Sequence, residues 1–186
     1  KNIIRQTSFS TSQQESRPIL TGINFKIDNN ILECTATDSY RLSRKKITVN
    51  SSLENTVNIV IPNRNVNELV KLLNDDEIDL EMHVFNNKVI FKFNSIIMMS
   101  RLINGTYPDT SKLIPDNFKI AMTVKLDEYI EAIDRASLLT NEADKNTIRL
   151  ESKENNIIIS SSIPEIGNVE ELVNIKKEVN EDIIIS

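Results

Sequence analysis

The stretch Ile23–Ala36, INFKIDNNILECTA, decides the fold class of this chain. Apolar residues alternate with polar ones in its first five positions, as they do in a strand that has one face on a core. Asp28-Asn29-Asn30 is a turn signal, and a second strand-like segment, Leu32–Ala36, follows it. The stretch therefore predicts a β-hairpin.

Segments of the same kind dominate the rest of the chain. Further strands are expected at residues 41–49, 57–61, 79–85, 88–93, 96–102, 119–125, 147–151, 157–161, 171–175 and 183–186. Asn86-Asn87 is a good two-residue turn between two of them. Cys34 is expected to face the core, His83 to lie on a strand surface, and Met98-Met99 to fill core space.

Two complete helices interrupt these strands. The first has apolar residues at the spacing i, i+3, i+4 and i+7, namely Val66, Leu69, Val70 and Leu73. Asn63 or Asn65 is expected to cap it. Asp127 is expected to cap the second helix, whose apolar face is predicted to contain Leu126, Ile130, Ile133 and Ser137, with Ala136 beside it.

An internal repeat connects the two halves of the chain. The helix end around Ser8 resembles the one around Ser137, 129 residues later. Ile23-Asn24-Phe25 matches Ile148-Arg149-Leu150 at an interval of 125, and residues 29–34 match residues 155–160 at an interval of 126. Coincidence is the competing explanation in a chain rich in Ile and Asn, but three matches in the same order favour two copies of one helix-and-hairpin domain.

The composition excludes most familiar catalytic machinery. One cysteine, Cys34, allows neither an internal disulfide nor a multi-cysteine zinc site, and one histidine, His83, leaves no histidine pair for a zinc hydrolase. Three glycines are too few for a phosphate-binding loop. Chemistry that needs only carboxylates survives this exclusion.

The net charge of −5 is unevenly distributed. Residues 1–114 carry 14 Lys and Arg against 12 Asp and Glu, a balance of +2, and residues 115–186 carry 8 against 15, a balance of −7. The group Arg41, Arg44, Lys45 and Lys46 is by charge alone a solvated edge strand, because lysines discourage edge pairing.

The two ends of the sequence have the pattern of a fragment. The chain starts without Met in what resembles the last turns of a helix, and it closes on the apolar strand EDIIIS. The cluster Leu113–Asn117 is typical of a boundary between domains. We therefore expect one domain at residues 1–116, with the start of its first helix missing, and a truncated second copy at residues 117–186.

Four longer motifs stand out: RPILTGI at 17–23, TATDSYRLS at 35–43, SRLINGTYPD at 100–109 and SLLTNE at 137–142. They resemble the family of bacterial β sliding clamps, the beta subunits of DNA polymerase III. The resemblance spans essentially the whole chain. It implies an α+β DNA-clamp fold of repeated domains, with antiparallel sheet outside and two helices inside, and it assigns the chain to the middle domain and part of the third.

The resemblance also implies a function without bond chemistry and without cofactors. Such a clamp is a processivity factor: two protomers close a ring around duplex DNA, independently of its sequence, and tether the polymerase III alpha subunit, the clamp loader and other clamp-motif proteins. It is expected in the cytoplasm, at the nucleoid during replication. Because the dimer contact of the family joins the first and third domains, we expect no ring from this fragment alone.

Two sites follow from the resemblance. Partner proteins of the family insert a short motif, Gln followed by Leu and Phe, into a pocket whose walls here would be Arg17, Leu20, Thr37, Ser39, Tyr40, Arg41, Leu42 and Pro115. Tyr40 departs from the family, which often has His there, and the C-terminal strand that completes the pocket is absent. Plain core roles are the competing explanation for Leu20 and Leu42.

The implied DNA contacts are Lys1, Arg5, Gln14, Arg64 and Lys71, for which ordinary surface charge is the alternative.

A competing hypothesis is a metal-dependent phosphodiesterase. Its candidate ligands are Asp75, Asp76, Glu77, Asp79 and Glu81. Such hydrolysis requires carboxylates that converge on one or two divalent ions. The run lies between a helix end and a strand, so its members are expected to point apart, and a solvated loop is the favoured interpretation.

Overall fold

The computed structural model describes residues 1–53, 55–73, 79–140, 147–164, 166–177 and 184–185. The chain divides into two compact units, Lys1–Asp109 and Thr110–Ser186. Leu113–Asn117, the segment expected as a linker, belongs to the second unit. Each unit has its own hydrophobic core, as independent domains do.

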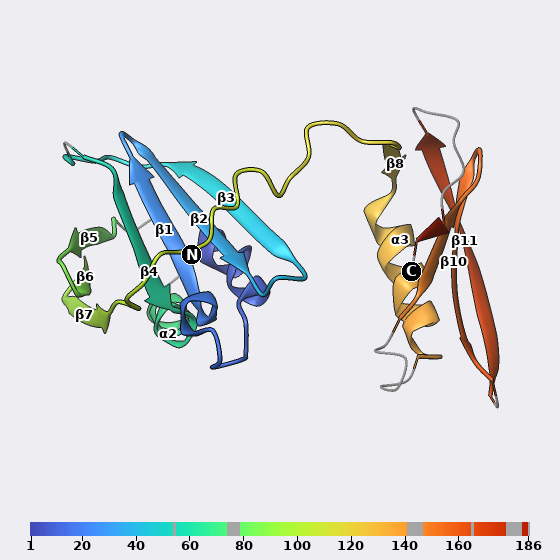
Figure 1. The fold of residues 1–186 in the computed structure, drawn as a ribbon, viewed down its shortest axis with the longest axis horizontal. Coiled ribbons are helices and arrows are strands. Elements are labelled where there is room, and N and C mark those ends of the chain that lie inside the picture. The colour runs from blue at the N-terminus through green and yellow to red at the C-terminus, as the bar shows by residue number, and fades with distance from the viewer. Residues whose placement is uncertain (54, 74–78, 141–146, 165, 178–183, 186) are drawn as a thin grey trace. The chain divides into compact units, whose positions relative to one another are not determined.

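The first unit places two helices against one face of an antiparallel sheet (Figure 1). The sheet has the order β3-β2-β1-β4. Its helices, α1 (Asn2–Arg5) and α2 (Asn63–Leu72), pack on each other, α1 against β3 and α2 against β1 and β4. The strands are β1 (Gly22–Asp28), β2 (Ile31–Thr37), β3 (Leu42–Thr48) and β4 (Val57–Pro62).

Three further strands form a smaller sheet in this unit. β5 (Glu81–Val84), β6 (Lys88–Phe93) and β7 (Ile96–Arg101) are antiparallel in the order β5-β6-β7, and β7 contacts β4. The inward side chains of both sheets and both helices share one core, which includes Ile23, Phe25, Cys34, Ile61, Val66, Leu69 and Phe91. Two short 3₁₀ helices, η1 (Ser8–Ser10) and η2 (Pro18–Thr21), lie between α1 and β1.

The second unit repeats this plan. Its sheet has the order β12-β9-β10-β11-β8, and α3 (Leu126–Ser137) packs on β10 and β11. The strands are β8 (Met122–Val124), β9 (Arg149–Ser152), β10 (Asn156–Ile163), β11 (Gly167–Lys177) and β12 (Ile184–Ile185). The orders β3-β2-β1-β4 and β11-β10-β9-β12 correspond strand by strand, which confirms the internal repeat.

Strand pairing corrects one interval of that repeat. Phe25 pairs with Cys34 in the first unit, and Leu150 pairs with Ile159 in the second. The interval is therefore 125 in both strands, and the value of 126 expected for the second strand is wrong. A shift of one residue would turn every side chain of that strand to the opposite face of the sheet.

Burial supports the interval of 129 for the helices. Ile3 and Thr7 of the first unit are buried, as are their equivalents Ala132 and Ala136 in α3. The second unit has alanine at both positions, where the first unit has the larger side chains of isoleucine and threonine. Its helix axis can therefore approach β10 closely, and the hydroxyl of Ser161 donates a hydrogen bond to the carbonyl of Ala136 at 2.6 Å.

The predicted helix caps are wrong in both units. α2 begins at Asn63, so Pro62 takes the cap position and no side chain caps the helix. The amides of Asn63 and Asn65 donate instead to Thr11 Oγ1 and Ser100 Oγ, each at 2.7 Å, and so tie α2 to its neighbours. The cap of α3 is Lys125, and Asp127 lies within the first turn, where its charge still favours the helix dipole.

The predicted apolar face of α3 is wrong in part. Leu126 and Ile130 are 67% and 46% exposed, and the face turned to the core contains Tyr129, Ala132, Ile133 and Ala136. Ile133 and Ala136 are therefore confirmed, whereas a search for large apolar residues overlooks Ala132, which is fully buried. Of the single residues, Cys34 is buried and His83 is exposed as expected, whereas only Met98 of the methionine pair packs on the core.

Candidate functional site

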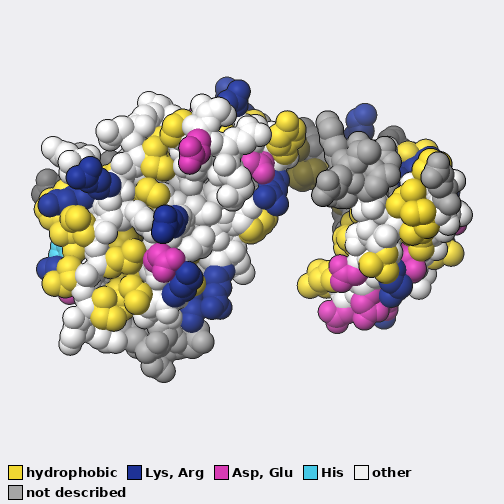
Figure 2. Space-filling view, turned by 90° about the horizontal axis from the view of Figure 1, so that it is seen from below, with side chains coloured by type: hydrophobic (Ala, Val, Ile, Leu, Met, Phe, Trp, Pro, Cys, Tyr) yellow, Lys and Arg dark blue, Asp and Glu magenta, His cyan; other side chains and the backbone are white. Residues whose placement is uncertain are grey.

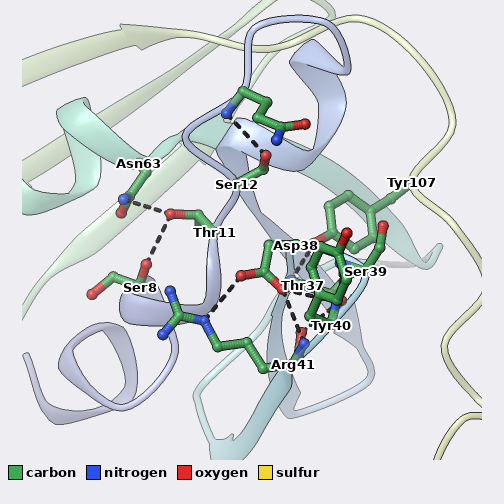
Figure 3. A network of polar contacts seen from close by, with 11 residues as sticks. Ser8, Thr11, Ser12, Thr37, Asp38, Ser39, Tyr40, Arg41, Asn63 and Tyr107 are labelled. Carbon is green, nitrogen blue, oxygen red and sulfur yellow. Dashed lines mark hydrogen bonds and ion pairs between the residues drawn. The ribbon is translucent and has the colours of Figure 1, made fainter. Parts of the chain in front are cut away.

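The loop between β2 and β3 is held in shape by the carboxylate of Asp38 (Figure 3). Asp38 Oδ1 accepts hydrogen bonds from the backbone N–H groups of Tyr40 and Arg41, at 3.0 and 2.9 Å, and Oδ2 accepts one from Arg41 Nε at 3.0 Å. The hydrogen bond from the Arg41 backbone is the main reason that the pKa of Asp38 is lowered. Ser39 takes a positive φ of 80°, which this turn requires.

Thr37, the last residue of β2, supports the same loop through its side chain and its backbone. Its hydroxyl donates to the carbonyl of Arg41 at 2.7 Å and accepts from the N–H of Ser39 at 3.1 Å. Its backbone N–H donates to the phenolic oxygen of Tyr107 at 3.0 Å (Figure 3). Burial raises the pKa of Tyr107, which stays a neutral phenol. Sequence reasoning missed Tyr107 as a site residue, although it lies within the quoted motif at 100–109.

A small apolar cluster underlies these polar contacts. Leu20, Val60 and Tyr107 are buried together, with Ile19 and Ile103 packed against them. The carbonyl of Leu20 accepts a hydrogen bond from the N–H of Ser12 at 2.9 Å. Leu20 therefore supports the site as a core residue. Leu42, by contrast, is half-buried and pairs with Thr37 across β2 and β3, directly beside the loop.

Two arginines and a tyrosine form the outer rim. Arg17 Nη1 donates to Ser39 Oγ at 3.4 Å, and the Arg41 guanidinium lies over the Phe9 ring at 5.8 Å. Tyr40 is 97% exposed. The structure thus brings seven of the eight expected pocket residues to one end of the β2–β3 pair or to η2 beside it. Pro115 belongs to the second unit, where it is exposed.

The expected DNA contacts lie on the helices of the first unit or next to them. Arg5 is exposed in the last turn of α1, Lys1 precedes that helix, and Arg64 and Lys71 are exposed on α2. Arg64 and Lys71 are seven residues apart, which places them on the same side of the helix. Gln14 lies in an exposed loop, where its N–H donates to Ser12 Oγ at 3.0 Å.

Charge differs between the helices of the two units. Figure 2 shows Lys and Arg side chains at several separate places on the first unit, and Asp and Glu side chains gathered at one end of the second. The exposed acidic residues of α3 are Asp127, Glu128, Glu131 and Asp134. Lys125 and Arg135 form ion pairs with Glu128, Glu131 and Glu171 at 2.9 to 3.6 Å, which neutralise part of that acidic surface, whereas Asp127 and Asp134 add further negative charge.

The carboxylate site expected for a phosphodiesterase is not assembled in the described residues. Asp75, Asp76 and Glu77 lie outside them. Glu81 pairs with His83 at 2.9 Å, and the described part of the chain contains no group of three His, Cys, Asp or Glu residues placed to hold a metal ion. No helix that the structure describes has the length and apolar character needed to cross a membrane.

Comparison with known proteins identifies the class. The fold matches solved DNA polymerase sliding clamps. With the clamp of Bacillus subtilis the TM-score is 0.93 at 41% identity, over 100% of this chain and 50% of that one. With the DNA polymerase III beta chain of Streptococcus pneumoniae it is 0.91 at 36% identity, over 98% and 48%. The α+β DNA-clamp fold is thereby confirmed.

Sequence comparison then gives the family. Residues 1–109 match the model of the DNA polymerase III beta subunit central domain, and residues 111–186 match that of its C-terminal domain. The beta sliding clamp of Staphylococcus aureus is 43% identical over 173 residues, which are 93% of this chain and 46% of the relative. The chain belongs to the DNA polymerase III beta subunit family and spans about half the length of these relatives. The phosphodiesterase hypothesis finds no support.

Proposed function

We propose that this chain is the partner-binding and DNA-facing part of a ring-forming sliding clamp, a processivity factor for DNA polymerase. In this proposal residues 1–109 are its middle domain, and residues 111–186 belong to its third domain. The full-length protein is a homodimer that encircles duplex DNA in the cytoplasm, at the nucleoid during replication, and performs no bond chemistry. The observation that carries the proposal is the pair of family-model matches, which follow each other along the chain in the order of the family.

The loop Asp38–Arg41 and its surroundings form the proposed docking site for a short Gln-Leu-Phe motif. Leu42 offers apolar surface beside the loop, and the apolar side chains of the motif would bury it. Arg17, Tyr40 and Arg41 provide a polar rim that can pair with the peptide backbone and the Gln side chain. Leu20, Thr37 and Ser39 hold this surface in place.

Tethering explains how such a protein raises processivity. A polymerase bound through its tail to a ring around DNA stays beside its template at a high effective concentration, so release from the primer end no longer ends synthesis. The polymerase III alpha subunit and the clamp loader are the proposed partners that bind the docking site.

Sliding along DNA needs contacts to phosphates without base readout. The residues proposed to supply these contacts are Lys1, Arg5, Gln14, Arg64 and Lys71.

Fluorescence anisotropy with a labelled Gln-Leu-Phe peptide tests the docking site. We expect saturable binding to this chain and a loss of at least about tenfold in Leu42→Asp, because a buried charge replaces an apolar contact. Ile31→Asp is the matched control, since Ile31 is 49% exposed at the opposite end of β2. Equal weakening by both substitutions, or no binding to the unsubstituted chain, would contradict a docking site on this unit.

A further inference from the structure

A strand-to-helix ion pair of the second unit has no counterpart in the described residues of the first. Glu171 of β11 accepts a hydrogen bond from Arg135 of α3 at 3.0 Å. In the sheet of the second unit Glu171 pairs with Ile159, and in the first unit Lys45 pairs with Cys34. Because Cys34 and Ile159 are equivalent, Lys45 occupies the position of Glu171. The same position of the sheet is therefore basic in the first unit and acidic in the second.

The helix partner has changed as well. Arg135 corresponds to Gln6, which is 129 residues earlier and directly follows α1. The backbone carbonyl of Gln6 accepts a hydrogen bond from the hydroxyl of Ser43 on β3. Ser43 and Lys45 lie two residues apart and hence on the same face of the strand. Lys45 thus projects from the face of the sheet that α1 covers. It lies two residues after Ser43, the residue that binds the end of α1.

Lys45 is exposed and is not paired with a carboxylate in the part of the chain that the structure describes. Its neighbour Lys46 points to the opposite face, where it forms an ion pair with Glu33 at 2.9 Å. The two lysines therefore differ in both direction and charge environment, although they follow each other in the sequence.

A second basic residue, Arg5, lies on the helix that packs against the strand of Lys45. Arg5 is exposed in the last turn of α1, the helix that packs against β3, and no ion pair with Arg5 is found among the described residues. The position equivalent to Arg5 in the second unit is Asp134, again with the charge reversed. Two independent positions on the helix side of the sheet are thus basic in the first unit and acidic in the second.

We propose that Lys45 is a further phosphate-contacting residue, which extends the DNA-facing surface of the first unit from α1 onto the edge strand β3. The inference rests on the proposed function, because it assumes that the helix side of the sheet faces duplex DNA. A lysine on an exposed edge suits such a contact, because its long side chain can follow a passing phosphate without reading a base.

Binding of a labelled duplex to this chain, followed by anisotropy between about 50 and 200 mM salt, tests the proposal. The slope of log affinity against log salt should fall by about 0.9 in Lys45→Gln, the amount expected for one lost phosphate contact. Lys46→Gln, which removes the same charge from the other face, should keep the original slope. Lys45→Arg should restore it, and thermal unfolding of each variant checks that the fold is intact.

The outcomes separate this inference from the function on which it rests. Equal slopes for Lys45→Gln, Lys46→Gln and the unsubstituted chain would overturn the role of Lys45 and leave the proposed DNA binding in place. Equal reductions by both Gln variants would show a general effect of charge and would also overturn it. If the unsubstituted chain does not bind the duplex at low salt, both the DNA contact and Lys45 are refuted together.

Discussion

The phenolic oxygen of Tyr107 accepts a hydrogen bond from the backbone N–H of Thr37, 70 residues away along the chain, at 3.0 Å. Tyr107 comes from the segment that follows β7, and Thr37 is the last residue of β2. Both residues are buried. The tyrosine therefore fixes the base of the Asp38–Arg41 loop from a distant part of the unit.

Tyr107→Phe is expected to destabilise the first unit and weaken peptide binding. The substitution leaves a buried N–H without a partner, which costs about 1–3 kcal/mol of the free energy of unfolding. Chemical denaturation and peptide anisotropy measure the two effects. Tyr40→Phe removes a hydroxyl from an exposed side chain and serves as the control for stability. An unchanged denaturation midpoint in Tyr107→Phe would refute the structural role of this hydrogen bond.

Peptide binding is expected to weaken in acid because of Asp38. Its hydrogen bonds lower the pKa of the carboxylate below its usual value of 3.8. A lowered pKa contributes stability that is complete above the pKa of the unfolded state and is lost as the pH falls through the lowered value. The loop should therefore keep its form from neutral pH to about pH 5 and open at more acidic pH.

Asp38→Asn separates this effect from other carboxylates. The amide keeps the size of the side chain but cannot titrate, so the variant should bind the peptide more weakly at pH 7 and lose less affinity than the unsubstituted chain on acidification. Peptide anisotropy across pH measures both. Parallel pH profiles for the two proteins would show that another group controls the loop.

Gly22→Ala is expected to disrupt the apolar cluster under the docking site. An added Cβ would lie 2.6 Å from Val60 Cγ1 and 2.8 Å from both Ile103 Cδ1 and the carbonyl oxygen of Ile61. Overpacking of this kind costs about 1–3 kcal/mol of the free energy of unfolding. Denaturation followed by a probe in each unit should show the loss in the first unit alone. A loss shared by both units would argue that they unfold together.

The thiol of Cys34 is expected to be inert in the folded protein. Burial raises its pKa to about 12, so almost no thiolate exists at pH 8. Labelling with a thiol-reactive disulfide reagent should be slow in buffer and fast in denaturant. Rapid labelling of the native chain would mean that β2 opens readily from the core.

The sequence predicted those parts of the fold that depend on local patterns. The hairpin from Gly22 to Thr37 is evident from alternation, since one face of each strand lies on the core. The face of α3 was mistaken in part because Ala132 carries little hydrophobic signal yet is fully buried in the core of its unit. Local periodicity reports the pattern of apolar and polar side chains, whereas burial depends on what the rest of the unit places opposite them.

The residues of the candidate site were named through motifs that resemble a known family, and their contacts were not predicted. Arg17, Thr37 and Arg41 were found through resemblance, and no pattern in the sequence predicted that Asp38 closes the loop or that Tyr107 supports it. These contacts depend on backbone geometry and on pairs distant in the sequence. A register error of one residue in β10 has the same origin, because turn residues alone do not fix which side chains face each other.

The Asp38 carboxylate has a kinetic consequence for the proposed docking site. Because three hydrogen bonds within the chain shape the loop, a peptide that binds there has little backbone to order. Different peptides should then bind this surface at similar association rates and differ chiefly in how long they stay bound. Under the proposed function, residence time would therefore determine how one partner replaces another.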